Sequence, residues 1–273
     1  MDTDRHAGKV VIITGAAGGI GAATARRLFG EGAGLMLSDI SNRRLLALAD
    51  ELDDESRVTV MKTDAAESDQ LEQLVASTVN RFGRLDTLVN NVGVITVGTV
   101  EETSPVDWHR VMDIDLHSVY YTSRAALPHL VRTKGSIVNT ASISGMYGNY
   151  GLLAYCTAKG AVINMTRTMA IDHARQGVRV NCVSPGPVNS HPGGMMDFPS
   201  MKEVYDANIP LGRVELPEEI APIISFLAST DASFVTGHNL VADGGLTAHS
   251  GEPNFNALYG DQLRATPGVV TAS

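Results

Sequence analysis

Short apolar runs, many of them rich in Val and Ile, alternate with longer amphipathic stretches along most of the chain. Several of the runs are unbroken rather than alternating, which is typical of parallel strands that are covered on both faces. They predict strands at Val10–Ile13, Leu35–Ser38, Val58–Lys62, Leu85–Asn90, Ser136–Thr140, Val178–Val183 and Asn239–Ala242.

The stretches between these runs have helical character. They predict helices at Gly19–Gly30, Arg43–Leu52, Ser68–Phe82, Pro105–Leu130, Tyr155–Arg175 and Pro217–Ala228. Repeated strand–helix–strand order requires a parallel sheet with right-handed crossovers. We therefore expect an α/β fold of the doubly wound Rossmann type, with a seven-stranded parallel sheet. Because no linker divides the pattern, residues 1–247 are predicted to form one catalytic domain, followed by an extension over residues 248–273.

Two segments depart from this rhythm. Ser190–Pro210 contains three prolines, two adjacent glycines and several Met and Phe side chains. This composition favours a mobile apolar flap, at about residues 190–210, over a fixed helix. His249–Ser273 is rich in small residues and is either a disordered tail or an arm that docks on a neighbouring subunit.

Composition narrows the class of protein. The 273 residues carry a formal net charge of −9, whereas a nucleic-acid-binding surface needs clustered Lys and Arg. The 2 cysteines form no disulfide framework and no zinc-binding spacing. The N-terminus lacks the apolar core of a secretory signal, and no run is long enough to span a bilayer. We expect a cytoplasmic protein with no metal site and no nucleic-acid or membrane partner.

The first strand leads directly into a glycine-rich turn, TGAAGGIG (Thr14–Gly21), and then into a helix. Glycine lets the backbone approach a pyrophosphate closely, and the free N–H groups of a helix N-terminus bind the anion. The spacing differs from the commoner G-x-G-x-x-G, but the strand–turn–helix context is that of a dinucleotide site. The candidate phosphate-binding residues are Gly15, Gly19, Ile20 and Gly21.

Acidic residues end the next two strands. Asp39 lies 18 residues after Gly21, where a carboxylate can accept hydrogen bonds from the adenosine ribose and repel a 2′-phosphate. This residue favours NAD over NADP as the cofactor. Asp64, with Ala65 beside it, follows the third strand and is a candidate contact to the adenine.

A second cluster points to acid–base chemistry. Ser142 follows the strand Ser136–Thr140, and Tyr155 and Lys159 share a helix face because they are four residues apart. A phenol is a poor base at neutral pH, but an ammonium about 4 Å away stabilises its ionised form by about 4 kcal/mol at an effective dielectric near 20. That is enough for general acid–base work, with Ser142 hydrogen-bonded to the substrate oxygen.

Taken together, these motifs resemble those of the short-chain dehydrogenase/reductase family, in its compact single-domain form, over about residues 8–247. The matching pieces are TGAAGGIG, Asp39, Asp64, NNVG (Asn90–Gly93), Ser142, YCTAK (Tyr155–Lys159), NCVSPGPV (Asn181–Val188) and VADGG (Val241–Gly245).

The resemblance implies a role for each catalytic residue. Tyr155 would be the general acid–base, Ser142 would orient the carbonyl or hydroxyl, and Lys159 would tune Tyr155 and hold the nicotinamide ribose. Further cofactor contacts would come from Asn91, Gly93, Pro185, Gly186, Val188 and Ser190. The resemblance also implies a homo-oligomer, a tetramer formed through the helices at Pro105–Leu130 and Tyr155–Arg175.

One position departs from the family pattern. The helix that normally carries a catalytic Asn reads MDIDLHS (Met112–Ser118), so that Asp115 takes the Asn position. In the family that Asn helps to hold a water in the proton relay to the lysine. Asp has nearly the same shape but lacks the NH₂ donor and can carry a charge. We expect Asp115 to support the relay, either protonated or paired with a nearby donor.

The predicted function is NAD-dependent interconversion of a secondary alcohol and a ketone by hydride transfer. The expected pocket wall of Val94, Ile143, Met146 and Leu152 favours a small, mostly apolar substrate. One alternative is a 3-oxoacyl-carrier-protein reductase, although those enzymes usually prefer NADP. Another is a catalytically weak dinucleotide-binding sensor on the same fold, which Asp115 alone favours.

Overall fold

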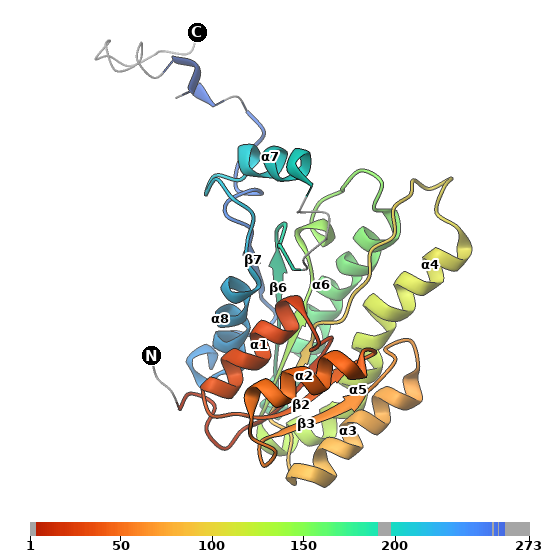
Figure 1. Cartoon of the computed structure of the whole chain (residues 1–273), viewed down its shortest axis with the longest axis vertical. Helices are drawn as coiled ribbons and strands as arrows, with labels where there is room; N and C mark the ends of the chain where they lie inside the picture. The colour runs from red at the N-terminus through yellow and green to blue at the C-terminus, as the bar shows by residue number, and fades with distance from the viewer. Residues whose placement is uncertain (1–3, 191–197, 253, 256, 260–273) are drawn as a thin grey trace.

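The computed structural model shows one parallel sheet of seven strands in the order β3-β2-β1-β4-β5-β6-β7, with helices on both faces (Figure 1). It describes residues 4–190, 198–252, 254, 255 and 257–259. The strands are β1 Val10–Thr14, β2 Gly34–Asp39, β3 Val58–Lys62, β4 Thr87–Asn90, β5 Ser136–Thr140, β6 Arg179–Pro185 and β7 Asn239–Ala242. The helices are α1 Gly19–Gly30, α2 Asn42–Leu52, α3 Ser68–Phe82, α4 Pro105–Met112, α5 Ser118–Thr133, α6 Leu153–His173, α7 Pro199–Asn208 and α8 Pro217–Ala228. The predicted fold class is confirmed.

Both faces of each central strand are buried, which explains the unbroken apolar runs of the sequence. Val11 and Ile13 of β1 belong to a core that includes side chains of α1, α2 and α8. Ile12, between them, belongs to a second core with side chains of α3, α5 and α6. Because successive side chains of a strand point to opposite faces, a strand between two helical layers is mostly apolar at consecutive positions rather than at every second one.

The helix predicted at Pro105–Leu130 is present as an unbroken helical run, but it is not α-helical throughout. The α-helix α4 passes into a π-helix, η1, at Asp113–His117, and α5 follows it. The backbone N–H of Ser118 donates to the carbonyl of Asp113, five residues back. Such π-turns widen a helix locally and are frequent at functional sites. The register of the side chains therefore changes at Asp115.

The expectation of a flap without a fixed helix is wrong for part of the segment, because residues 199–208 form α7. Pro199 occupies the first turn, where its missing N–H costs nothing, and Phe198 before it is extended. The proline that argued against a helix in the sequence is thus a helix-start residue. Residues 191–197, and the tail beyond 259, lie outside the described residues.

The strand order reverses beside β1. The chain moves outward from β1 through β2 to β3 and then returns to the other side of β1 with β4. In sheets of this kind the crevice at the carboxyl ends of the strands beside the reversal is the usual ligand site. The carboxyl ends of β1, β4 and β5 meet there, so a ligand site is expected between the loops that follow these strands.

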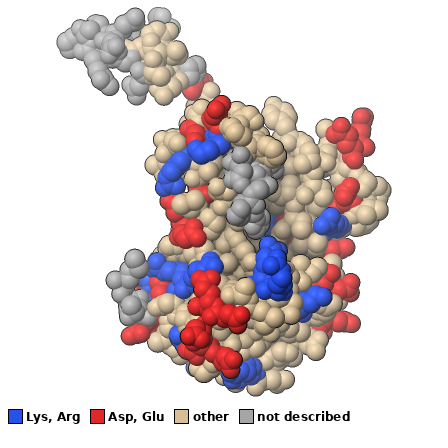
Figure 2. All heavy atoms as spheres, viewed as in Figure 1, with Lys and Arg blue, Asp and Glu red and all other residues tan. Residues whose placement is uncertain are grey.

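The surface and the helices limit the kinds of partner that the fold suggests. Asp and Glu side chains are interspersed with Lys and Arg over the face drawn in Figure 2. Among the described helices, none combines the length and apolar character needed to cross a membrane. In the same residues, no three His, Cys, Asp or Glu side chains are grouped so that they could hold a metal ion.

Candidate active site

The glycine-rich turn after β1 is packed too closely for side chains. A Cβ on Gly21 would lie 2.1 Å from the carbonyl oxygen of Gly15, so any residue larger than glycine would displace the turn. Asn91, after β4, donates from Nδ2 to the same oxygen at 3.2 Å. Helix α1 then begins with no side-chain cap and no acidic residue in its first turn. This helix N-terminus fits a pyrophosphate, because within the described part of the chain no side chain caps its N–H groups.

Asp39 lies beside this turn and is held by it. Its Oδ2 accepts the backbone N–H of Ala17 at 3.1 Å, and its Oδ1 accepts that of Ser41 at 2.9 Å. The carboxylate is therefore fixed where β2 ends, next to the glycine-rich turn, as a ribose-binding residue must be.

Asn91 joins the cofactor side of the crevice to the catalytic side. Its backbone N–H donates to Oγ1 of Thr14 at 3.0 Å, and its Oδ1 accepts from Oγ1 of Thr140 at 3.2 Å. One side chain thus links the carboxyl ends of β1 and β5 across β4.

Other predicted cofactor residues lie at the same edge of the sheet. Ser190 approaches the start of α1, since a Cβ on Gly19 would lie 3.0 Å from the Cβ of Ser190. Pro185 ends β6 and precedes Gly186 and Val188. Asp64 and Ala65 follow β3, two strands from β1. The Asp64 carboxylate accepts the N–H of Ala66 at 3.0 Å. The adenine contact of Asp64 and Ala65 stays a prediction.

Lys159 is the centre of the cluster that was predicted to be catalytic. The residue is 3% exposed, and its Nζ donates to the carbonyl oxygen of Thr140 at 3.1 Å. The same Nζ lies 5.6 Å from the ring centroid of Tyr155, one turn earlier on α6. The buried ammonium and the half-buried phenol thus lie side by side on one face of α6.

Ser142 is held against the helix that carries Tyr155 and Lys159. Its Oγ accepts the backbone N–H of Ser144 at 3.1 Å at the start of the short 3₁₀ helix η2, Ile143–Gly145. A Cβ on Gly145 would lie 2.5 Å from the carbonyl carbon of Lys159. The segment that follows Ser142 therefore packs directly on the backbone of α6, and only glycine permits this approach.

Asp115 is paired with Lys159. Its Oδ2 lies 3.2 Å from Lys159 Nζ, and its Oδ1 accepts the backbone N–H of Val94 at 2.8 Å. Asp115 is completely buried, and apart from the ion pair its Oδ2 has no hydrogen-bond partner. The second of the two sequence expectations, pairing with a nearby donor, is the one that the structure shows.

Gly93 makes room for this ion pair. A Cβ at position 93 would lie 3.0 Å from Oδ2 of Asp115 and 3.2 Å from Nζ of Lys159. A side chain here would push the two charged groups apart or away from the crevice. Gly93 was predicted as a cofactor contact, and this second reason for glycine was not visible in the sequence.

The protonation state of the pair follows from its surroundings. Burial alone would lower the pKa of Lys159, but the charges of Asp115 and Tyr155 outweigh it, so that the net direction is upward. Burial raises the pKa of Asp115, opposed by Lys159 and by the Val94 N–H. Because both carboxyl oxygens face donors, a proton on Asp115 would have no acceptor. The pair is therefore an ammonium and a carboxylate.

The predictions missed a buried polar ladder behind the site. Nδ2 of Asn90 on β4 donates to Oδ1 of Asn139 on β5 at 2.9 Å, and Nδ2 of Asn139 donates to Oγ1 of Thr166 on α6 at 2.8 Å. On the other side Thr122 Oγ1 donates to Asn90 Oδ1 at 2.9 Å. The ladder connects α5 and α6 to the strands between them. A polar residue within a largely apolar strand is the sequence signal from which it could have been predicted.

Replacing Asn139 by Ala removes one buried hydrogen bond from each of its two partners, Asn90 and Thr166. Because each such loss costs about 1–3 kcal/mol, Asn139→Ala is expected to lower the free energy of unfolding by about 2–4 kcal/mol in urea titrations. Exposed Asn164 on α6 provides the control, since Asn164→Ala should change it by less than about 0.5 kcal/mol. Equal stabilities for the two variants would contradict a structural role for the ladder.

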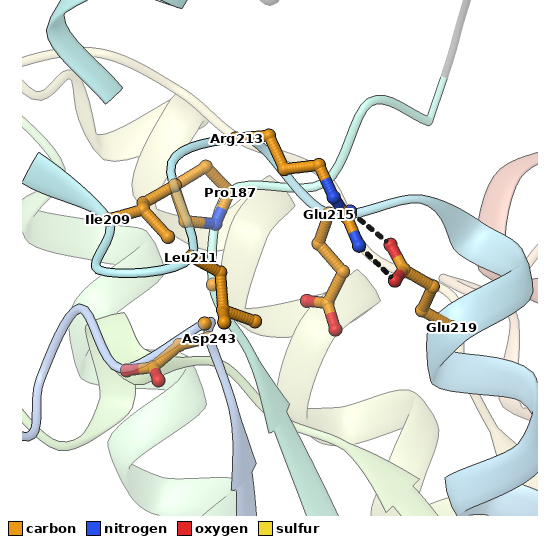
Figure 3. A pocket seen from close by; sticks show the side chains of 9 residues that line it. Pro187, Ile209, Leu211, Arg213, Glu215, Glu219 and Asp243 are labelled. Carbon is orange, nitrogen blue, oxygen red and sulfur yellow. Dashed lines mark hydrogen bonds and ion pairs between the residues drawn. The ribbon is translucent and has the colours of Figure 1, made fainter. Parts of the chain in front are cut away.

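Glu215 is a second residue that the predictions missed. Its backbone N–H donates to the carbonyl of Pro187 at 3.0 Å, and its carbonyl accepts the N–H of Asn189 at 2.8 Å. The half-buried carboxylate lies in a small cavity, between Asp243 and the Arg213–Glu219 ion pair (Figure 3). Its buried Oε2 has no hydrogen-bond partner. Burial, followed by the charges of Glu219 and Asp243, raises the pKa of Glu215 to about 7.

This pKa gives the folded state a pH-dependent stability. Since the folded pKa lies above the ordinary 4.5, the contribution of Glu215 is present below about pH 4.5 and is lost as pH rises through 7. Glu215→Gln removes the ionisation, so it should raise Tm relative to the unmodified protein above pH 7 and leave it unchanged near pH 4.5. The same substitution at exposed Glu218 should change Tm equally little at both pH values. A Tm difference for Glu215→Gln that does not vary with pH would contradict the assignment.

A glycine-rich turn at a helix N-terminus, a fixed ribose-side carboxylate and a buried Lys–Tyr pair define a dinucleotide-binding oxidoreductase. A family model described as enoyl-(acyl carrier protein) reductase matches residues 15–247. The chain belongs to the short-chain dehydrogenase/reductase family, as its motifs indicated.

Individual relatives agree with this assignment. The chain is 43% identical to meso-2,3-butanediol dehydrogenase from Serratia marcescens over 92% of its length and 99% of the relative. It is 37% identical to a 3-oxoacyl-acyl-carrier-protein reductase from Thermotoga maritima, over 89% of this chain and 99% of that one. Among solved structures, a short-chain dehydrogenase/reductase (glucose/ribitol dehydrogenase) from Brucella melitensis matches with a TM-score of 0.83 and 36% identity, covering 90% of this chain and 99% of that chain.

Proposed function

We propose that the protein is an NAD-dependent dehydrogenase that converts a small, mostly apolar secondary alcohol into the ketone and catalyses the reverse reduction. One observation carries the proposal: Lys159 is buried beside Tyr155 and held between the Thr140 carbonyl and Asp115. This cluster lies at the carboxyl edge of the sheet, where Asn91 connects it to the glycine-rich turn.

The residues divide the chemistry among them. Tyr155 takes the hydroxyl proton of the alcohol, while the Ser142 hydroxyl hydrogen-bonds to the same oxygen and orients it. Lys159 stabilises the ionised form of Tyr155. Overall, alcohol and NAD⁺ give ketone, NADH and one proton. The reverse direction uses Tyr155 as the acid.

The cofactor fits the groups that surround the crevice. Gly15, Gly19, Ile20 and Gly21 would hold the pyrophosphate, Asp39 the adenosine ribose, and Asp64 with Ala65 the adenine. Asn91, Gly93 and Lys159 would lie along the nicotinamide ribose, and Pro185, Gly186, Val188 and Ser190 beside the ring. NAD bound there supplies the acceptor for the hydride that leaves the alcohol carbon.

Turnover with a panel of alcohols tests the proposal. The protein should form NADH, measured by absorbance, with meso-2,3-butanediol or with other small secondary alcohols such as cyclohexanol, and should do so more slowly with NADP. Binding of NAD without turnover anywhere in the panel would instead support a dinucleotide-binding sensor.

The second candidate function is reduction of a 3-oxoacyl thioester, which the 37% identity to the Thermotoga maritima reductase favours. The net charge of −9 opposes it, because an acidic carrier protein is attracted by a basic surface. Oxidation of NADPH by acetoacetyl thioesters, faster than any alcohol reaction with NAD, would make this the principal function.

The proposal extends to the assembly and its location. Helices α4, α5 and α6 carry exposed apolar side chains, among them Val106, Tyr120 and Ile171, which are 76%, 49% and 77% exposed. They support a homotetramer, as the family resemblance implies, and light scattering on the purified protein tests it. Cys156 and Cys182 are free thiols, which is consistent with a reducing, cytoplasmic location.

A further inference from the structure

The charge next to the catalytic lysine sets this chain apart from the family pattern. Asp115 is fully buried, and its two oxygens face two donors, the ammonium of Lys159 and the N–H of Val94. An Asn here could accept from only one of them and would turn its NH₂ toward the other. The geometry therefore suits a carboxylate better than an amide, and the site holds a negative charge beside the ammonium.

Few other charges act at this place. Among the residues that the structure describes, the titratable groups that face Lys159 are Asp115, from η1, and Tyr155, from its own helix. β5 contributes the uncharged carbonyl of Thr140, and Gly93 contributes backbone only. The thiol of Cys182 on β6 stays neutral, since burial raises its pKa to about 11. The balance between Asp115 and Lys159 thus determines the field at Tyr155.

We propose that Asp115 is a positioning residue that acts as a fixed counter-charge to Lys159, holding the ammonium in place while weakening its field on the Tyr155 hydroxyl. The enzyme consequently works at a higher pH than it would with an uncharged residue at this position. This inference rests on the proposed role of Tyr155 as the acid–base.

The sign follows from the charges. A negative charge on Tyr155 would be attracted by the Lys159 ammonium and repelled by Asp115, which is paired with the same ammonium. Removing the carboxylate leaves the phenolate as the only counter-charge for Lys159, so that the ionised tyrosine becomes more stable. Lys159 keeps its proton, because the Thr140 carbonyl still accepts from it and an ionised Tyr155 also raises its pKa.

The test is the pH profile of kcat/KM for oxidation of meso-2,3-butanediol, or of the best alcohol of the panel, with saturating NAD. Between about pH 6 and 10, the acidic limb of Asp115→Asn should lie about one pH unit below that of the unmodified enzyme. Asp113→Asn is the matched control: it makes the same substitution on the same π-helix, where Asp113 is exposed and paired with His117. Its profile should not move.

A purely structural role for Asp115 would lower kcat or Tm without moving the limb. An acidic limb of Asp115→Asn at the same pH, or at a higher pH, overturns the proposal. A second readout does not need turnover: the ultraviolet absorbance of the Tyr155 phenolate, taken as the difference from the matching Tyr155→Phe protein, should appear at lower pH in Asp115→Asn. If no alcohol is oxidised, the proposed function fails, while this titration still decides the role of Asp115.

Discussion

Tyr155→Phe should lower kcat for alcohol oxidation by roughly 10²–10⁴, because the phenyl ring fills the same space but cannot accept the hydroxyl proton. Tyr155 is the half-buried phenol beside the Lys159 ammonium. Affinity for NADH, measured by fluorescence, and Tm should both stay close to those of the unmodified protein. The expected defect is therefore in kcat alone.

Tyr120→Phe makes the same change on α5, where Tyr120 is 49% exposed. Tyr120→Phe should leave kcat unchanged. Comparison of the two variants then shows whether the defect is specific to the Tyr155 hydroxyl or follows from the loss of any tyrosine hydroxyl. Retention of more than about a tenth of kcat by Tyr155→Phe would show that another group moves the proton.

Asp39→Asn should reduce the preference for NAD over NADP by roughly 100-fold, measured as the ratio of the two kcat/KM values. The Asp39 carboxylate is fixed by the N–H groups of Ala17 and Ser41 beside the glycine-rich turn. It cannot move away from a 2′-phosphate without breaking these bonds. Removing its charge removes the repulsion but keeps the shape of the side chain.

Asp64→Asn is the control for the cofactor preference. Asp64 follows β3 and bonds to its own turn through Ala66, so its replacement should affect both cofactors in proportion and leave their ratio unchanged. If Asp39→Asn also leaves the ratio unchanged, Asp39 is only a structural tie and the choice of NAD has another source.

The sheet could be predicted because its signal is local and strong. A strand such as β5, Ser136–Thr140, is buried along its whole length and was predicted with its observed bounds. Strand and helix ends otherwise differ from prediction by at most two residues, outside Pro105–Leu130. Burial on both faces favours an unbroken run of β-branched and apolar side chains at the centre of such a strand, here Ile137 and Val138, and a surface strand or helix does not produce this pattern.

Two features were not predicted from the sequence, the π-helix η1 and the helix α7. The π-helix η1 differs from an α-helix in its backbone hydrogen bonds, which reach five residues back, as from Ser118 to Asp113. A pattern of apolar positions does not show this change over a single turn. In α7, Pro199 was weighed as a helix breaker, although at the first turn of a helix it is favourable.

The individual residues of the candidate site could be predicted from the sequence, but the pairing of their charges could not. The sequence left open whether Asp115 is protonated or paired, because its partner, Lys159, is 44 positions away in the chain. The π-turn directs the Asp115 side chain toward this partner. The structural roles of Gly93 and Glu215 depend on their contacts with Asp115 and Pro187, respectively. Such contacts exist only after folding and have no signature within a short window of sequence.

Transfer of deuterium tests the central claim most directly. The protein is incubated with NAD and a secondary alcohol deuterated at the carbinol carbon, and the reduced cofactor is examined by mass spectrometry. We expect one deuterium in each NADH formed, with the ketone as the other product, and none with Tyr155→Phe over the same time. Binding of NAD with no transfer of deuterium from any alcohol of the panel would contradict the assignment as an alcohol dehydrogenase.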